Sequence, residues 1–139
     1  MVIVEINHAL KMKVAGLARK HDLSCVVLFG SQASGRTHAH SDTDIAFMSD
    51  KDIDYRASLM IQTDFSDALD VTDLELVNMR RVSPLFARQI ADKGILLYED
   101  RRGRFVDFRV MTFKLYVETA PLRRLRENYL TNFLKAHAY

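Results

Sequence analysis

Two acidic residues separated by one residue, Asp42 and Asp44, are the strongest chemical signal in this sequence. They stand at the start of a short segment, Thr43 to Met48, whose composition predicts a β-strand. Side chains two positions apart on a strand share one face, so the two carboxylates repel each other unless a cation or a proton lies between them. Hard oxygen ligands favour Mg²⁺. The pair therefore predicts a magnesium site at the beginning of a strand.

A glycine-serine turn precedes this pair by ten residues. The apolar run Val26 to Phe29 ends at Gly30 and Ser31, and the small residues 33–35 follow. Small residues allow the backbone to approach a ligand closely, so amide N–H groups and the Ser31 hydroxyl can hold phosphate oxygens. Gly30 and Ser31 are therefore candidate residues for binding the phosphates of a nucleotide.

A third carboxylate is expected from a neighbouring strand. The segment 72–79 is predicted to be a strand and carries Asp73 and Glu75, whose side chains share one face by the same alternation. The spacing alone leaves both residues as candidates.

The elements that must position these residues follow from hydrophobic periodicity and helix-end signals. Helices are predicted over 8–20 behind an Asn7 cap, over 55–69, and from Pro84 to a C-terminal Gly94 with Ser83 as the cap. Short strands are predicted over 26–29, 43–48, 72–79 and 95–98, and two helices beyond Gly103. This mixed order of elements predicts a small sheet with helices packed on it.

Composition limits the class of protein. A chain of 139 residues is expected to form one compact domain. No apolar run approaches the roughly 18 residues that span a bilayer, and the start of the chain lacks the pattern of a signal peptide. Cys25 is the only cysteine and lies in an apolar run, which favours an inert buried thiol. We therefore expect a cytoplasmic protein without membrane contact.

Charge is unevenly distributed along the chain. Residues 1–100 carry a net charge of −4 and residues 101–139 a net charge of +6. A solvated helical surface explains such a segment simply, but a docking surface for another macromolecule is the functional prediction. We expect docking through Arg101, Arg102, Arg104, Arg123, Arg124 and Arg126, and do not favour direct binding of nucleic acid.

The combination of Gly30-Ser31 with Asp42-x-Asp44 resembles the minimal nucleotidyltransferase (MNT) family of the DNA polymerase β superfamily, the antitoxins of HEPN/MNT toxin–antitoxin pairs. The resemblance covers nearly the whole chain. It implies an active site of Gly30, Ser31, Asp42, Asp44 and Glu75, and favours Glu75 over Asp73 by its place in LELVNM. Two departures are Gln32, where an Arg is common, and Glu75 itself, where Asp is usual.

The resemblance also implies a fold and a reaction. The expected fold is α/β of the nucleotidyltransferase (polymerase β-like) type, with a short mixed sheet, packed helices and two C-terminal helices. Residues 1–139 would form a single minimal nucleotidyltransferase domain, with a catalytic core over 1–100 and a basic helical extension over 101–139. The implied reaction transfers AMP from ATP to a tyrosine of a cognate HEPN ribonuclease toxin, using two Mg²⁺ ions held by Asp42, Asp44 and Glu75, within a hetero-oligomer of the two proteins.

Other interpretations use the same residues. The chain could act as a non-catalytic antitoxin that masks the toxin, or could modify a small molecule such as an aminoglycoside. His38 and His40 extend the pattern to H-x-H-x-D-x-D, similar to a metallo-β-lactamase motif, but Thr43 stands where that motif needs its next His. The C-terminal HAY resembles the end of the HEPN motif, yet no Arg stands at positions 130–132, so the chain is not expected to be the toxin.

Overall fold

The computed structural model describes residues 6–30 and 43–138 of the chain. Ser31 and Asp42 therefore lie outside the described residues, together with Gln32, His38 and His40. The strands are β1 (Leu23–Phe29), β2 (Thr43–Ser49), β3 (Leu74–Asn78) and β4 (Ile95–Glu99). The helices are α1 (His8–Lys20), α3 (Tyr55–Leu69), α4 (Pro84–Lys93), α5 (Arg104–Glu118) and α6 (Ala120–Ala136).

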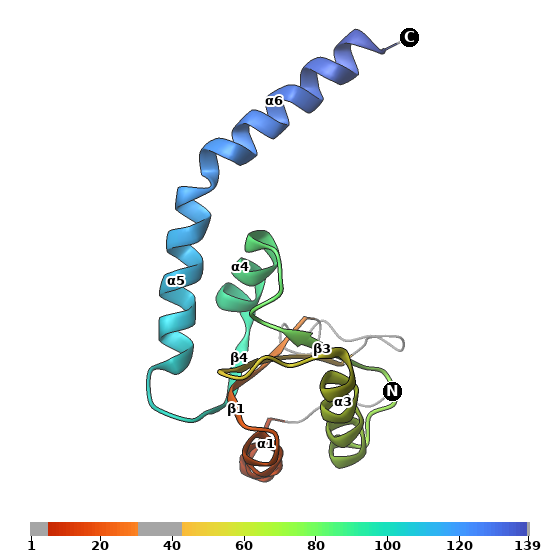
Figure 1. The fold of residues 1–139 in the computed structure, drawn as a ribbon, viewed down its shortest axis with the longest axis vertical. Helices are drawn as coiled ribbons and strands as arrows, with labels where there is room; N and C mark the ends of the chain where they lie inside the picture. Colours follow the sequence, from red (N-terminus) through yellow and green to blue (C-terminus); the bar gives the residue numbers. More distant parts are fainter. Residues whose placement is uncertain (1–5, 31–42, 139) are drawn as a thin grey trace.

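The four strands form one mixed sheet in the order β3-β2-β1-β4 (Figure 1). Strand β1 runs antiparallel to both β2 and β4, while β2 and β3 are parallel. All seven residues of β1 are buried, as expected for a central strand covered on both faces. The predicted small sheet is confirmed. Its two central strands are β2 and β1, and the first residues of β2 lie beside the last residues of β1.

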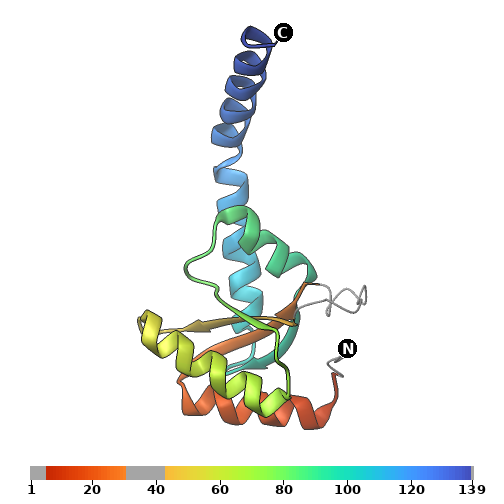
Figure 2. The same ribbon diagram turned by 90° about the vertical axis from the view of Figure 1, so that its right-hand side faces the viewer.

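Helices cover both faces of this sheet (Figure 2). On one face, α1 and α3 close a core that contains Val14, Phe47 and Phe65, all fully buried. On the other face, α4 and α5 pack over Val27, and Ile90 and Phe105 complete that second core. The sheet is thus the middle layer, and the face under α4 and α5 is the one that carries Ala46 and Val77 from β2 and β3.

Helix starts agree with the capping signals in the sequence. The Asn7 side chain accepts a hydrogen bond from the Leu10 N–H at 2.9 Å, and the Ser83 hydroxyl accepts one from the Phe86 N–H at 3.2 Å. These bonds satisfy amide groups that the first turn of a helix leaves without a partner. The predicted helices over 8–20 and 55–69 are confirmed at both ends.

The end of α4 is predicted correctly, but the reason for its glycine is different. Gly94 ends the helix with a φ of −70°, outside the left-handed region that usually selects glycine there. A Cβ on Gly94 would overlap the carbonyl oxygen of Ile90 and would lie 2.5 Å from Cγ1 of Val27. Glycine is required because α4 closes against β1, and not because of its backbone angle.

Cys25 packs inside the core beneath α4 and α5, where it is fully buried. Burial in this apolar setting, with a smaller effect of the Glu99 carboxylate, raises the pKa of its thiol to about 12. The thiolate is the reactive form, so the predicted inert packing role is confirmed.

The two expected C-terminal helices follow β4. Helix α5 runs alongside α4 and buries Phe105 and Thr112, whereas α6 continues away from the body and buries none of its residues (Figures 1 and 2). Among the described residues, no helix combines the length and apolar character needed to cross a bilayer.

Candidate active site

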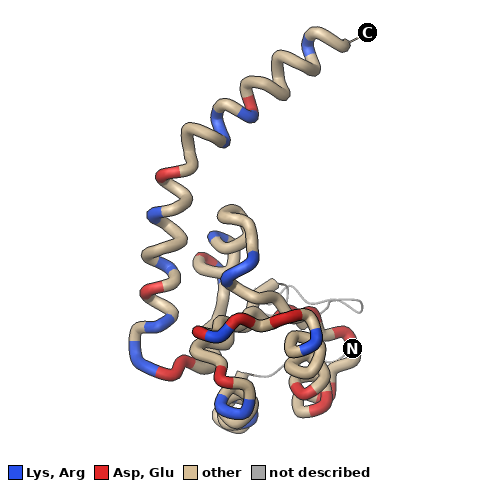
Figure 3. The backbone as a smooth tube through the Cα atoms, viewed as in Figure 1, with Lys and Arg blue, Asp and Glu red and all other residues tan. Residues whose placement is uncertain are grey.

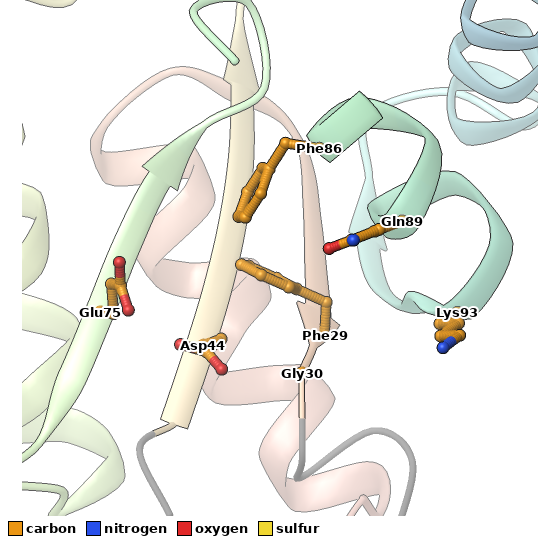
Figure 4. A pocket seen from close by; sticks show the side chains of 7 residues that line it. All are labelled: Phe29, Gly30, Asp44, Glu75, Phe86, Gln89 and Lys93. Atoms are coloured by element: carbon orange, nitrogen blue, oxygen red, sulfur yellow. The ribbon is translucent and has the colours of Figure 1, made fainter. Parts of the chain in front are cut away.

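Sheet register brings two of the predicted acidic residues together. Asp44 on β2 lies opposite Phe29 of the antiparallel β1 and opposite Glu75 of the parallel β3. Neighbouring strands are about 4.8 Å apart, and residues in register project to the same face. The Asp44 and Glu75 side chains therefore lie on the α4 side of the sheet (Figure 4). Two carboxylates from neighbouring strands therefore face the same side of the sheet, near the end of β1 and the start of β2.

Gly30 completes this edge of the site. It follows directly on β1 and has a φ of +77°, in the left-handed region that favours glycine. A Cβ at this position would overlap Oδ2 of Asp44 and lie 3.0 Å from Cγ of the same residue. Both the backbone angle and the close approach of the Asp44 carboxylate therefore require glycine here. The structure thus gives a reason for glycine at position 30, and binding of phosphate by this turn stays a prediction.

A pocket of about 750 Å³ opens over these residues. Its lining is Phe29, Gly30, Asp44, Glu75, Phe86, Gln89 and Lys93 (Figure 4). The rings of Phe29 and Phe86 form an edge-to-face pair with centroids 5.6 Å apart, and this pair gives the pocket an apolar wall between the sheet and α4. A volume of this order accommodates a nucleotide-sized ligand.

Helix α4 contributes three lining residues that sequence reasoning missed: Phe86, Gln89 and Lys93. They follow one another at intervals of three and four, which places them on one face of a helix. The buried residues Ala87, Ile90 and Ala91 of the same helix pack toward the body. The sequence does place Gln89 and Lys93 next to the apolar stripe of α4. Only the packing of α4 over β1 shows that these residues face the same pocket as the two carboxylates.

The structure separates the two candidates for the third acid. Glu75 lines the pocket and stands in register with Asp44. Asp73 precedes β3, its carbonyl oxygen accepts a hydrogen bond from the Thr43 N–H at 3.0 Å, and it is absent from the described lining. Gly30, Asp44 and Glu75 are thus brought together, while the positions of Ser31 and Asp42 remain predictions from the sequence.

Comparison with known proteins agrees with this geometry. The family described as Polymerase beta, Nucleotidyltransferase matches residues 12–103, which hold all four strands. A protein of Shewanella oneidensis named Protein adenylyltransferase MntA is 31% identical over 94 residues, 68% of this chain and 66% of that protein. A protein of the same name from Aphanizomenon flos-aquae is 26% identical over 125 residues, 81% of each.

A solved structure extends the likeness to three dimensions. The crystal structure of a toxin–antitoxin with AMP-PNP contains a chain that superposes with a TM-score of 0.76 at 27% identity, covering 87% of this chain and 98% of that one. The expected polymerase β-like fold, a short mixed sheet with packed helices, is confirmed.

Proposed function

This chain belongs to the polymerase beta nucleotidyltransferase family, and on that basis we propose that it transfers AMP from ATP to a tyrosine of a HEPN-family ribonuclease toxin and so neutralises it. Relatives named Protein adenylyltransferase MntA support a protein as the acceptor. The likeness to a toxin–antitoxin structure with AMP-PNP supports an adenine nucleotide as the donor. The observation that carries the proposal is the pairing of Asp44 with Glu75 in a pocket beside the Gly30 turn.

The carboxylates of this pocket suit a divalent cation of the magnesium type. Asp44 and Glu75 supply hard oxygen atoms from one face of neighbouring strands, and like charges in register are stabilised by a shared cation. We assign Asp42, Asp44 and Glu75 to the ligand set of two Mg²⁺ ions. When bound, such ions offset negative charge on the triphosphate and on the leaving pyrophosphate.

The chain's own residues bind and orient the nucleotide. Backbone N–H groups of the Gly30-Ser31 turn, with the Ser31 hydroxyl, hold phosphate oxygens. Lys93 supplies a positive charge from the α4 side of the pocket, and its ammonium group pairs with the triphosphate. The apolar wall formed by Phe29 and Phe86 limits the access of water to the bound nucleotide.

The transfer replaces one P–O bond at the α-phosphorus of ATP with another. The tyrosine oxygen of the acceptor attacks the α-phosphorus of ATP, a new P–O bond forms, and the bond from that phosphorus to the bridging oxygen breaks. Pyrophosphate leaves with the electron pair, and the hydroxyl proton passes to a carboxylate of the site. ATP and Mg²⁺ are both supplied by the cytoplasm, to which we assign the chain.

Intact-mass analysis tests the proposal. The chain is incubated with ATP, Mg²⁺ and the HEPN-family protein encoded beside it, and the expected result is a gain in mass of that protein by one or more AMP units. Asp44→Asn should abolish the gain, whereas Asp73→Asn, which changes a neighbouring acid outside the pocket lining, should preserve it.

Two outcomes would replace the proposal. Neutralisation of the toxin without any change of mass would establish a non-catalytic antitoxin that acts by complex formation. Transfer of AMP to an aminoglycoside, with the HEPN-family protein unmodified, would establish a small molecule as the acceptor.

A further inference from the structure

Helix α6 exposes large apolar side chains along its whole length. It spans 17 residues, none of them buried. The exposed fractions are 67% for Leu122 and Leu125, 68% for Tyr129 and 46% for Phe133, and Leu130 and Leu134 are also exposed. In proteins most of the stability of a helix comes from the packing of its apolar face, not from helix propensity. The described body does not provide that packing.

Four of the exposed apolar side chains of α6 form one face. Leu122, Leu125, Tyr129 and Phe133 recur at intervals of three and four, which places them on the same side of the helix. Glu127 and Thr131 lie on the opposite side. At ~100 Å² each, the four residues of the apolar face expose on the order of 400 Å², within the range of the largest apolar patches on monomeric proteins, which are often functional.

The charge of α6 indicates which partner fits. The helix carries Arg123, Arg124, Arg126 and Lys135 against a single acidic residue, Glu127 (Figure 3). Two copies of α6 packed face to face would bring like charges together, which disfavours a second copy of this chain. A different protein with an apolar groove rimmed by acidic residues would bury the apolar face and pair with the basic side chains of α6.

Helices α5 and α6 together form an arm. The first residues of this arm are fixed to the body. Oε1 and Oε2 of Glu99 accept hydrogen bonds from the N–H groups of Gly103 and Phe105 at the start of α5, at 3.3 and 3.1 Å. At the junction with α6, Arg123 donates to the Tyr116 carbonyl at 2.7 Å and lies 3.7 Å from the centre of the Tyr116 ring. These contacts hold α6 in one direction relative to the body.

Helix α4 links this arm to the pocket. It packs against α5 through Arg109, which donates to the Ala91 carbonyl at 2.9 Å, while its Gln89 and Lys93 line the pocket. A protein held on α6 therefore lies at a defined position relative to the site. We propose that the apolar face of α6 (Leu122, Leu125, Tyr129 and Phe133) docks the acceptor protein through an acid-rimmed apolar groove, an inference that rests on the proposed function.

Paired substitutions on the two sides of α6 test this proposal. Leu125→Ser with Phe133→Ser removes apolar side chains from the face, and Glu127→Gln with Thr131→Ser is the matched control on the opposite side. Because α6 buries no residue, both variants should keep the melting temperature of the wild-type chain. Calorimetric affinity for the HEPN-family protein encoded beside the chain should fall at least tenfold in the first variant and remain unchanged in the control.

Kinetics separate this docking role from the chemistry. The Leu125→Ser, Phe133→Ser variant should raise the KM for the acceptor protein with little change in kcat or in ATP affinity. Asp44→Asn should bind the acceptor normally and transfer nothing. Binding without transfer by the wild-type chain would remove the proposed function and leave the docking surface in place.

Three results would overturn the proposal. The first is equal acceptor affinity of the apolar-face variant and its control. The second is a wild-type chain that does not bind the acceptor at all. The third is a wild-type chain that sediments as a dimer and becomes monomeric in the apolar-face variant, because a second copy would then be the occupant of this face.

Discussion

At the scale of single residues, the pairing of two strands keeps two acidic side chains of the site close to each other. The β2–β3 pairing holds the Asp44 and Glu75 carboxylates in register, where like charges repel. Lys93 enters the same pocket from a helix, so the described lining of this pocket includes two acids and one base. This distribution suits a ligand that has negative phosphates and carries its own divalent cation.

We predict that the two acids act in transfer and not in folding. Asp44→Asn and Glu75→Gln should reduce AMP transfer roughly 10³-fold or more, since charge stabilisation in such a site is worth at least that much. Their melting temperatures without Mg²⁺ should match or exceed that of the wild type, because each change removes one of two like charges. Thermal melts with and without Mg²⁺ and ATP measure both effects.

Asp73→Asn is the control for this prediction, since Asp73 precedes β3 and lies outside the described pocket lining. Loss of transfer in Asp73→Asn, with Glu75→Gln fully active, would reverse the choice of the third acid.

Lys93 is predicted to bind the triphosphate. Lys93→Ala should weaken ATP about tenfold, as expected for a partly solvated charge-assisted contact worth ~1.5 kcal/mol. Its affinity for adenosine, which has no phosphate, should not change. Calorimetry with both ligands measures this difference, and Lys13→Ala on the exposed surface of α1 is the matched control. An equal loss of affinity for adenosine would show that Lys93 does not act on the phosphates.

At the scale of elements, the turns and helix ends set the positions of these residues. Gly30 and Gly103 both have a positive φ, +77° and +95°, but their surroundings differ. A Cβ would overlap the Asp44 carboxylate at Gly30 and would meet nothing within 4 Å at Gly103. The two glycines therefore separate the effect of backbone strain from the effect of displacing a site residue.

Gly30→Ala should lower the free energy of unfolding by roughly 1 kcal/mol or more, and should also reduce ATP affinity and AMP transfer, because Asp44 must move. Gly103→Ala should lower stability by a similar amount and leave ATP affinity unchanged. Denaturant unfolding and calorimetry on both variants test this. Normal ATP affinity in Gly30→Ala would mean that the displaced carboxylate is not needed for nucleotide binding.

A second glycine pair tests the packing of α4 against the sheet. Gly94→Ala should destabilise the chain by about 1–3 kcal/mol, because its Cβ would press on Val27 and on the Ile90 carbonyl. Gly16→Ala, in the interior of α1 with nothing within 4 Å, should instead stabilise by about 0.5–1 kcal/mol. Urea unfolding of both variants gives the two signs. A neutral Gly94→Ala would show that α4 can shift away from β1.

Local sequence signals predicted the elements better than the pocket. The helices over 8–20 and 55–69 were predictable because a helical stripe and a capping residue lie within a few positions of each other. The choice between Asp73 and Glu75 was not, since strand alternation treats them alike and only the register with Asp44 distinguishes them. Gln89 and Lys93 were missed because their helix meets β1 through packing that no local pattern encodes.

At the scale of the whole molecule, the basic C-terminal segment is partly structural. Arg104 donates to Asp100 at 2.8 Å and reaches Asp50 at 3.4 Å, and Arg123 holds the junction of α5 with α6. Arg104 therefore fixes the arm to the body, and Arg123 stiffens the arm. The exposed Arg102, Arg124 and Arg126 are better placed for the predicted electrostatic docking. Such docking should weaken as salt rises.

Burial of side chains on α5 bears on where the folded body ends. Phe105 is 3% exposed in the core beneath α5, and Thr112 is also buried, whereas α6 buries nothing. We therefore propose that the stable unit includes α5, in place of the expected division into 1–100 and 101–139.

Two truncations test this boundary. A chain ending at Thr119 should melt close to the full-length protein and bind ATP normally, because only α6 is removed. A chain ending at Asp100 loses Phe105, and losing one large core side chain costs about 3–5 kcal/mol. Its melting temperature should therefore fall by about 10 °C or more. Equal melting temperatures for the two truncated chains would support a boundary at residue 100. They would mean that the buried side chains of α5 do not stabilise the core.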